Sequence, residues 1–329
     1  MSEDRILEGI GDRDESLDYF GELNKEKGVL SPEYLHRLEE SKWFYKYKHK
    51  MLIEILKKSD LDFEDKIITD IGVGTGKLSK ELEQFGEIDY RFDSSKEYKR
   101  YAEEEFNLEI EEGSLPYKIE LKESNIVYLL DVLEYLIVPG LSLNVIYNHL
   151  KEGGYLVLTT VFHNYLHSEV NKQNGVVKRY SKRYLDQMLR GYGFEIKYFS
   201  YLDYEVFRLA ILKNLTKEGL VYPVTKLREK EKENKLYKES MFDLLRIKNN
   251  QELPYGRGGV YICQKIEQTE EEQKEAKKKL EGEQWKNDEA KLLDSKYLER
   301  VIERFFKLDG LEDQEDKDTI NKEKGGKDE

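Results

Sequence analysis

The sequence contains a single cysteine, Cys263, and only five prolines in 329 residues. One cysteine cannot form a disulfide within the chain, and it cannot supply a cysteine-based metal site. The sequence also has no apolar run as long as a membrane-spanning helix, and no apolar segment follows a basic start at the N-terminus. From these absences we expect a cytoplasmic protein without a membrane span.

An excess of positive charge is also missing. The 55 lysines and arginines are outnumbered by 68 aspartates and glutamates, so the formal net charge is −13. This charge repels the phosphate backbone of nucleic acids, and no basic cluster interleaved with aromatic residues offsets the repulsion. We therefore expect no nucleic-acid partner. The length fits one large domain, or one domain with an appendage.

The most informative segment is IITDIGVGTGKL, residues 67–78. An apolar run ends at Asp70, a turn containing Gly72, Gly74 and Gly76 follows, and apolar residues then recur at the spacing of one helix face. A strand, a glycine turn and a helix start bring backbone N–H groups to one point. This arrangement is typical of a site for a nucleotide-like or anionic group.

Three kinds of loop share this general form. The dinucleotide fingerprint needs a third glycine where this chain has Lys77, which argues against a nicotinamide oxidoreductase. A phosphate-binding P-loop needs glycine at Ile71 and Ser or Thr at Leu78. The remaining form, Asp-x-Gly-x-Gly-x-Gly over 70–76, resembles the first motif of class I S-adenosylmethionine-dependent methyltransferases. On this motif alone, a glycine-rich turn of purely structural use is the alternative.

Strand patterns alternate with helical patterns, which predicts an α/β fold. We expect a doubly wound, Rossmann-like, seven-stranded and mostly parallel sheet with helices on both faces, because several strands are apolar throughout. The predicted strands are 66–71, 88–92, 108–111, 125–130, 155–160, 195–199 and 258–265. The last of them is consistent with antiparallel pairing near the sheet edge. Two helices from Pro32 onward precede the first strand, and further helices are predicted at 77–85, 95–106, 140–151 and 181–192.

Changes in composition divide the chain. The predicted parts are an acidic lead-in (1–31), the sheet domain (32–266) with a helical insertion that caps the substrate (203–256), a charged spacer plus amphipathic helix (267–308), and a disordered tail (309–329). The apolar stripe within 285–306 is expected to dock on its own domain or on a copy of it. A homodimer formed through 203–256 or 285–306 follows as an expectation.

Polar residues that end predicted strands are candidate ligand contacts, because ligands of such sheets bind at the carboxyl ends of the strands. Asp93 ends the second strand, and its carboxylate can accept hydrogen bonds from two ribose hydroxyls; a helix N-cap is the alternative. Ser114 and Leu115 follow the third strand, where an adenine would lie, and a plain turn accounts for them equally well. Asp131, followed by Val132, comes directly after the fourth predicted strand and is expected to face the methyl donor and acceptor.

The segment LEESKWF, residues 38–44, resembles the Glu-Ser-x-Trp-Phe lead helix of a bacterial methyltransferase family. Across 32–266, further blocks are similar to that family in the same order and spacing, namely 70–76, Asp93, 131–136, 151–154, 177–181 and 253–256. The resemblance implies a class I fold with S-adenosylmethionine as methyl donor. The residues it assigns to donor binding are Asp70, Gly72, Gly74, Gly76, Asp93, Ser114, Leu115, Asp131 and Val132.

The sequence departs from this family between the fifth strand and the basic element at 177–181. Family members commonly carry His-Asp and Gly-His pairs there, whereas this chain has Val-Asn at 170–171 and Gly-Val at 175–176. Histidine is the natural base near neutral pH. His163 and His167 lie on the same loop and are candidate catalytic residues together with Asp131. An ordinary surface or packing role is the alternative for both histidines.

Methyl transfer from a sulfonium is an in-line displacement that requires alignment of the two reactants and exclusion of water, but no metal. We therefore expect a metal-independent, S-adenosylmethionine-dependent methyltransferase. Members of the resembling family often accompany glycosyltransferases of surface-polysaccharide or lipid-linked-sugar synthesis, which implies a small-molecule or sugar-containing acceptor. The alternative is a catalytically impaired S-adenosylmethionine-binding or interaction protein on the same fold.

Overall fold

The computed structural model describes residues 31–41, 43–163, 175–204, 244, 246–247, 253, 255–267, 269 and 271. All of them belong to the first of two compact units, Met1–Lys278. The expectations for His167, the lead-in, most of the 203–256 insertion and the segments after 271 concern residues outside this part of the chain.

A seven-stranded sheet with the order β3-β2-β1-β4-β5-β7-β6 forms the centre of the fold. The strands are β1 (Ile68–Ile71), β2 (Tyr90–Asp93), β3 (Glu111–Glu112), β4 (Ser124–Leu130), β5 (Leu150–Val161), β6 (Phe194–Leu202) and β7 (Gly258–Lys265). β1 to β5 pair in parallel, whereas β7 lies antiparallel between β5 and β6. The mostly parallel seven-stranded sheet predicted from the sequence is confirmed, including its antiparallel last strand.

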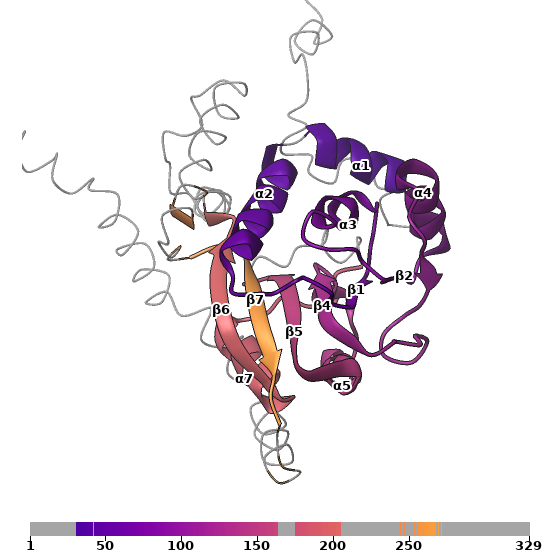
Figure 1. Cartoon of the computed structure of the whole chain (residues 1–329). Coiled ribbons are helices and arrows are strands. Elements are labelled where there is room, and N and C mark those ends of the chain that lie inside the picture. Colours follow the sequence, from indigo (N-terminus) through magenta and orange to yellow (C-terminus); the bar gives the residue numbers. More distant parts are fainter. Residues whose placement is uncertain are drawn as a thin grey trace, which may run out of the picture. The chain divides into compact units, whose positions relative to one another are not determined.

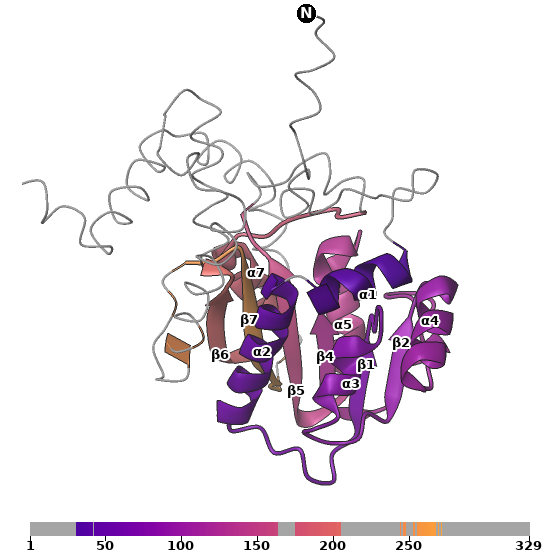
Figure 2. The same ribbon diagram turned by 90° about the horizontal axis from the view of Figure 1, so that it is seen from above.

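Helices cover both faces of this sheet (Figures 1 and 2). α1 (Pro32–Ser41), α2 (Trp43–Lys58), α3 (Lys77–Leu82) and α4 (Lys96–Phe106) lie on one face, and α5 (Pro139–His149) and α7 (Lys182–Gly191) on the other. A short 3₁₀ helix, η2 (Leu133–Tyr135), follows β4.

The core lies between α2 and the sheet. α2 buries Met51, Leu52, Ile55 and Leu56 in one cluster with Ile68 of β1, Tyr128 of β4, Val157 of β5 and Ile262 of β7. Full burial of an apolar side chain of this size contributes about 1.5–3 kcal/mol. The lead helix α2 is therefore fixed on the domain, and its polar side chains are held at defined positions near the sheet edge.

Some boundaries differ from the sequence prediction. The helix after the glycine turn ends at Leu82, yet Phe85 still packs on the core, with its ring centroid 5.0 Å from that of Phe63. β3 contains only two residues, because Leu108 and Ile110, which suggested an earlier strand, pack in a cluster with Val73 and Ala102.

Gly153 and Gly154, which precede the strand predicted at 155–160, lie inside β5. The strand begins at Leu150, and its register with β4 shifts between the Ser124–Leu150 pair and the Ile126–Tyr155 pair. The extra residues on β5 form an irregularity in the strand, which accommodates the glycines without ending the strand.

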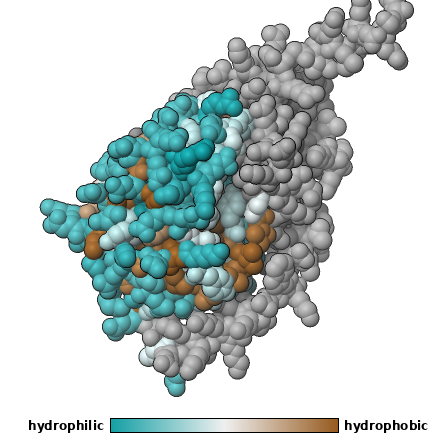
Figure 3. Space-filling model, turned by 90° about the vertical axis from the view of Figure 1, so that its right-hand side faces the viewer, coloured by the Kyte–Doolittle hydropathy of each residue, from teal (hydrophilic) through white to brown (hydrophobic). Residues whose placement is uncertain are grey.

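The described surface is mostly hydrophilic on the face shown in Figure 3, with a hydrophobic area among the polar side chains. Large hydrophobic residues that are exposed include Tyr135, Ile137, Val138 and Leu141, from η2 to the start of α5, and Val177. Among the helices described, none is both long enough and apolar enough to cross a membrane.

Candidate functional site

The candidate site lies at the carboxyl ends of the parallel strands. β1 leads into the glycine loop, β2 ends at Asp93, β4 ends just before Asp131, and His163 follows β5. In sheets of this topology, ligands bind outside this edge. The side chains that the sequence singled out on separate segments are therefore brought to one edge.

The glycine loop depends on positive φ angles, which are 83° at Gly72, 60° at Gly74 and 88° at Gly76. A Cβ on Gly72 would lie 2.3 Å from Val132 Cγ2, and one on Gly76 would lie 2.8 Å from Ala102 Cβ. At Gly74 no atom of the described part of the chain lies within 4 Å of that position. The outer two glycines thus allow close packing against the protein, whereas a Cβ on Gly74 would meet none of the described residues.

Asp93 is bonded to the loop. Its Oδ2 accepts the Gly74 N–H at 2.8 Å, and its Oδ1 accepts the Ser95 N–H at 2.8 Å. The carboxyl is 7% exposed, and burial raises its pKa while these backbone bonds act in the opposite direction. Ser95 rather than Asp93 caps α4, because the Ser95 Oγ accepts the Tyr98 N–H. The capping role considered for Asp93 thus belongs to its neighbour.

Asp70 lies beneath the loop and is 3% exposed. Burial raises the pKa of its carboxyl to about 6, against the effect of a hydrogen bond from Ser79 and the charge of Arg91. Because the group is enclosed and bonded inside the protein, it is positioned to support the loop from within.

The turn after β3 adjoins Asp93, whose carbonyl oxygen accepts the Gly113 N–H at 2.9 Å. Ser114 and Lys118 exchange backbone hydrogen bonds of 2.7 and 2.8 Å, which close this turn. Ser114 is exposed, and Leu115 is 8% exposed. The turn expected to flank an adenine therefore lies next to Asp93.

Asp131 has a left-handed backbone with a φ of 57°. Its N–H donates to the carbonyl oxygen and the hydroxyl of Thr159, at 3.1 and 3.0 Å, and the Thr159 hydroxyl donates to Asp131 Oδ1 at 2.9 Å. The Lys48 ammonium donates to Oδ2. Although burial acts to raise the pKa of Asp131, the charge and hydrogen bond of Lys48 hold it below its usual value, so the group is a fixed anion.

His163 is engaged in the fold. Its Nε2 lies 2.8 Å from the Gly256 carbonyl oxygen, and since a carbonyl only accepts, Nε2 carries the proton. Burial lowers the pKa of the ring to about 4, so it is neutral at pH 7. This contact ties the loop after β5 to the turn before β7, which is a structural role for a residue predicted as a candidate base.

Glu134 is 3% exposed, and its Oε2 accepts a hydrogen bond of 2.9 Å from the Thr160 hydroxyl. Burial, with a smaller contribution from Asp131, raises the pKa of the carboxyl to about 7. The Glu134 carbonyl oxygen accepts the N–H groups of Val177 and Lys178, at 2.8 and 3.1 Å. The basic element at 177–181 is therefore held against the segment that follows β4.

Two residues of the lead helices were missed by sequence reasoning. Glu39 of α1 accepts a 2.6 Å hydrogen bond from the hydroxyl of Thr75 in the glycine loop, and Lys48 of α2 bonds to Asp131. Glu39 directly precedes the lead-helix motif, which begins at Glu40, so the sequence drew attention to this segment but gave no role to Glu39. Lys48 lies between Lys46 and Lys50 in a lysine-rich stretch, and no sequence pattern distinguishes it from these neighbours.

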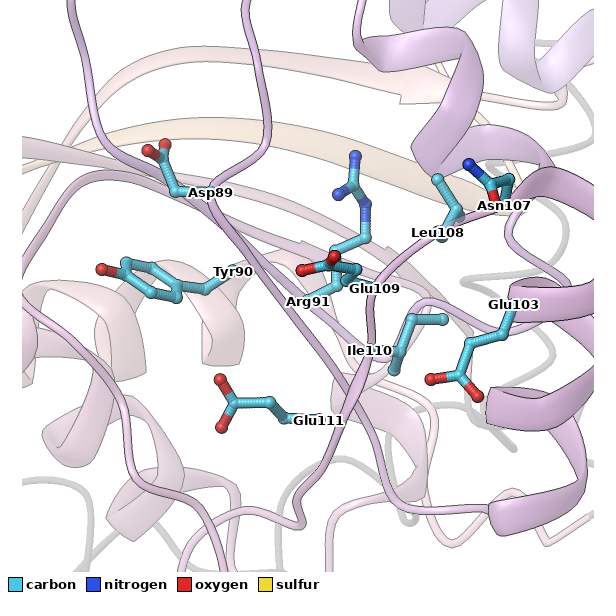
Figure 4. Close-up of a pocket in the computed structure, with 9 residues that line it drawn as sticks. All are labelled: Asp89, Tyr90, Arg91, Glu103, Asn107, Leu108, Glu109, Ile110 and Glu111. Carbon is cyan, nitrogen blue, oxygen red and sulfur yellow. The ribbon is translucent and has the colours of Figure 1, made fainter.

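A shallow pocket of about 360 Å³ lies away from this edge (Figure 4). It is lined by Asp89, Tyr90, Arg91, Glu103, Asn107, Leu108, Glu109, Ile110 and Glu111. The Arg91 guanidinium is bonded to Ser79, Glu83 and the Ile88 carbonyl, so it is not available to a ligand. In the described ranges, no three His, Cys, Asp or Glu side chains are grouped as metal ligands.

Comparison with known proteins finds a family model that matches part of the chain. Residues 43–198 match the family model described as a methyltransferase domain. A search of curated protein sequences gives no significant match. Many solved structures are similar, at low identity.

Three of these solved structures illustrate the similarity. A Haloferax volcanii complex with the Trm112 methyltransferase activator matches at 16% identity over 68% of this chain and 92% of that one, with a TM-score of 0.46. An S-adenosylmethionine-dependent methyltransferase of Thermotoga maritima matches at 20% identity over 71% of this chain and 98% of that one, with a TM-score of 0.43. Haemonchus contortus phosphoethanolamine N-methyltransferase 2 with S-adenosyl-L-methionine matches at 17% identity over 73% of this chain and 61% of that one, with a TM-score of 0.44. At these identities and TM-scores the solved structures carry no argument about this chain, and the family match concerns residues 43–198.

Proposed function

We propose that this chain is a class I S-adenosylmethionine-dependent methyltransferase, and that it methylates a small molecule or a sugar-containing intermediate. The match of residues 43–198 to a methyltransferase domain and the strand order of the sheet support the first part. The acceptor class rests on the ordered blocks of sequence that resemble a bacterial family of such enzymes. We also propose a cytoplasmic location, from the lack of membrane-span and leader patterns in the sequence, and a homodimer formed through 203–256 or 285–306, from the apolar patterns there.

The main support for the proposed donor site is the backbone conformation and surroundings of Gly74. Its φ of 60° and the open space where a Cβ would project leave its backbone accessible, immediately beside the carboxylate of Asp93. These features fit a methionine-like moiety lying along the loop and a ribose bonded to Asp93. In this proposal Ser114 and Leu115 flank the adenine, Val132 closes the loop side, and Asp70 supports the loop from below.

S-adenosylmethionine would supply a methyl group already attached to a good leaving group. The residues of the chain then have to align the acceptor and keep water away. Asp131 is suited to the alignment, because Thr159 fixes one carboxylate oxygen and Lys48 the other. None of these roles requires a metal, so we propose a metal-independent reaction.

Calorimetric titration with S-adenosylhomocysteine tests the donor site. We expect the full chain to bind it and Asp93→Ala to bind it at least tenfold more weakly, because both the ribose contact and the acceptor of the Gly74 N–H are lost. Asp62→Asn is a matched control, since Asp62 is an exposed carboxylate that pairs with Lys66. Absence of binding to the unmodified chain at millimolar ligand would refute the proposal.

A catalytically impaired donor-binding protein is the second candidate. The state of His163 favours this second candidate. The residue was predicted as a substitute base, but its Nε2 already donates a hydrogen bond to the Gly256 carbonyl oxygen, and burial lowers the pKa of its ring. Binding of S-adenosylhomocysteine without methylation of any fraction of a cell extract would support this candidate. Methyl transfer to any acceptor from labelled donor would exclude it.

A further inference from the structure

A cluster of ionic groups extends from Asp131 away from the glycine loop. The Lys48 ammonium of α2 is bonded to Asp131, and the charges of Glu134 and Asp203 lie close enough to contribute to the raised pKa of Lys48, against the opposing effect of burial. Glu134 and Asp203 are each 3% exposed. The side chain of Asp131 is 40% exposed, and that of Lys48 is 18% exposed. Asp131 is therefore the member of the cluster that a ligand reaches.

Three residues that follow strands at this edge of the sheet have a left-handed backbone conformation. Asp131 follows β4, His163 follows β5 and Asp203 follows β6, and all three are left-handed, with φ angles of 57°, 66° and 60°. A left-handed conformation costs about 1–2 kcal/mol for a residue with a Cβ, and glycine would avoid that cost. Strain of this kind concentrates at functional sites.

The cluster has more hydrogen-bond acceptors than donors. Asp203 Oδ2 pairs with Arg257 Nη2 at 3.1 Å, but no donor in the described part of the chain reaches the buried Oδ1 of Asp203. The Lys48 ammonium is bonded to Asp131, and the charges of Glu134 and Asp203 also act on it. Such surroundings favour a ligand that carries N–H donors and positive charge.

The cluster also adjoins the proposed donor site. Val132, the next residue after Asp131, packs on the glycine loop so closely that a Cβ on Gly72 would lie 2.3 Å from its Cγ2. Asp131 thus lies between the loop and the remaining carboxyl groups. A group bound by Asp131 would be close to a donor held by the loop.

We propose that Asp131, Glu134 and Asp203 form an acceptor subsite for a cationic amine, and that the ammonium of Lys48 occupies this subsite in the free protein. The inference rests on the proposed function and specifies the acceptor class. Lys48 is a positioning residue that holds Asp131 ionised, and an incoming ammonium replaces it at the carboxylate.

The atoms balance for an amine acceptor. The bound ammonium loses one proton to solvent, its nitrogen lone pair forms the bond to the methyl carbon, and the carbon–sulfur bond breaks with its electron pair remaining on sulfur. The product is a methylated ammonium, which keeps the positive charge opposite Asp131. A hydroxyl acceptor would need a base, whereas Asp131 is ionised with a lowered pKa and the Lys48 ammonium has no lone pair.

Sinefungin and S-adenosylhomocysteine test the subsite by calorimetry on the full chain. Sinefungin has an amine in place of the transferred methyl group, so it brings an ammonium to the transfer point, and S-adenosylhomocysteine has none. We expect Asp131→Asn to weaken sinefungin about tenfold and S-adenosylhomocysteine less than threefold, because one charge pair is lost. Asparagine tolerates the left-handed backbone, and Asp62→Asn is the control for loss of a remote charge.

A second variant tests the role of Lys48. Lys48→Met removes the internal cation, so the affinity ratio of sinefungin to S-adenosylhomocysteine should rise at least threefold, while Lys48→Arg should leave it near that of the unmodified chain. Equal effects of Asp131→Asn on both ligands, or an unchanged ratio in Lys48→Met, would overturn the inference. If neither ligand binds the unmodified chain, the proposed donor site itself fails. Should one variant not fold, the other decides.

Discussion

The hydroxyl of Thr75 in the glycine loop donates a 2.6 Å hydrogen bond to Glu39 on the lead helix α1. Both side chains are buried, at 2% and 9% exposure, and 36 residues separate them in the sequence. The loop is therefore held from two sides, by Asp93 through the backbone of Gly74 and by Glu39 through Thr75.

Replacing Glu39 should weaken both folding and donor binding. In Glu39→Ala the buried Thr75 hydroxyl loses its acceptor, which costs about 1–3 kcal/mol of unfolding free energy, measured by urea denaturation. Binding of S-adenosylhomocysteine should fall several-fold because the loop loses one anchor. Glu40→Ala is the matched control, since Glu40 is exposed and its carboxylate makes surface contacts of 3.6 Å with His36 and 3.4 Å with Lys77. Equal losses in the two variants would contradict this role.

The loop glycines should separate into a binding position and a packing position. Gly74→Ala should cost only the left-handed strain of about 1–2 kcal/mol, yet reduce S-adenosylhomocysteine affinity at least tenfold, because its methyl group occupies the open space. Gly76→Ala should be less stable by about 1–3 kcal/mol more, because the new methyl lies 2.8 Å from Ala102. Thermal melts and calorimetry on both variants measure the two effects. The same affinity at Gly74→Ala as in the unmodified chain would show that no ligand uses that space.

Glu134 should make the protein less stable as the pH rises. Its pKa is raised to about 7 in the fold, from an ordinary value of 4.5, so the folded chain holds this proton more tightly than the unfolded chain. Its contribution is fully present below pH 4.5 and is lost as the pH rises through about 7. Glu134→Gln keeps the shape and removes this titration.

Urea denaturation of both proteins between pH 5 and 8 measures the effect. The unfolding free energy of Glu134→Gln minus that of the unmodified chain should increase across this range. Asp70 also has a raised pKa, and it changes the unfolding free energy with pH in the same way in both proteins. The difference between the two proteins therefore reports Glu134 alone. A difference that does not vary with pH would contradict the prediction.

His163 should titrate far below an ordinary histidine. Burial lowers its pKa to about 4. An NMR titration of the five histidines should therefore contain one resonance with a midpoint near 4 that is absent from His163→Asn. A midpoint between 6 and 7 for that resonance would restore His163 as a candidate base near neutral pH.

Local patterns were sufficient for most of the fold. The run at 258–265 predicted the last strand with the bounds observed for β7, because a short apolar segment with turn residues on one side specifies a buried strand without reference to its neighbours. The third strand was misplaced, because Leu108 and Ile110 are apolar for packing against Val73 and Ala102. A hydrophobic residue indicates burial, and not which element buries it.

The candidate site likewise has features that local sequence predicts and features that it does not. The spacing of Gly72, Gly74 and Gly76 is a local property of the chain, since each glycine is required by its own backbone angle, and the sequence alone was enough to predict the loop. The contacts of Glu39 with Thr75 and of Lys48 with Asp131 join positions 36 and 83 residues apart. Only the packing of α1 and α2 on the sheet brings these side chains together, because no local pattern records which distant group a charged helix residue will meet.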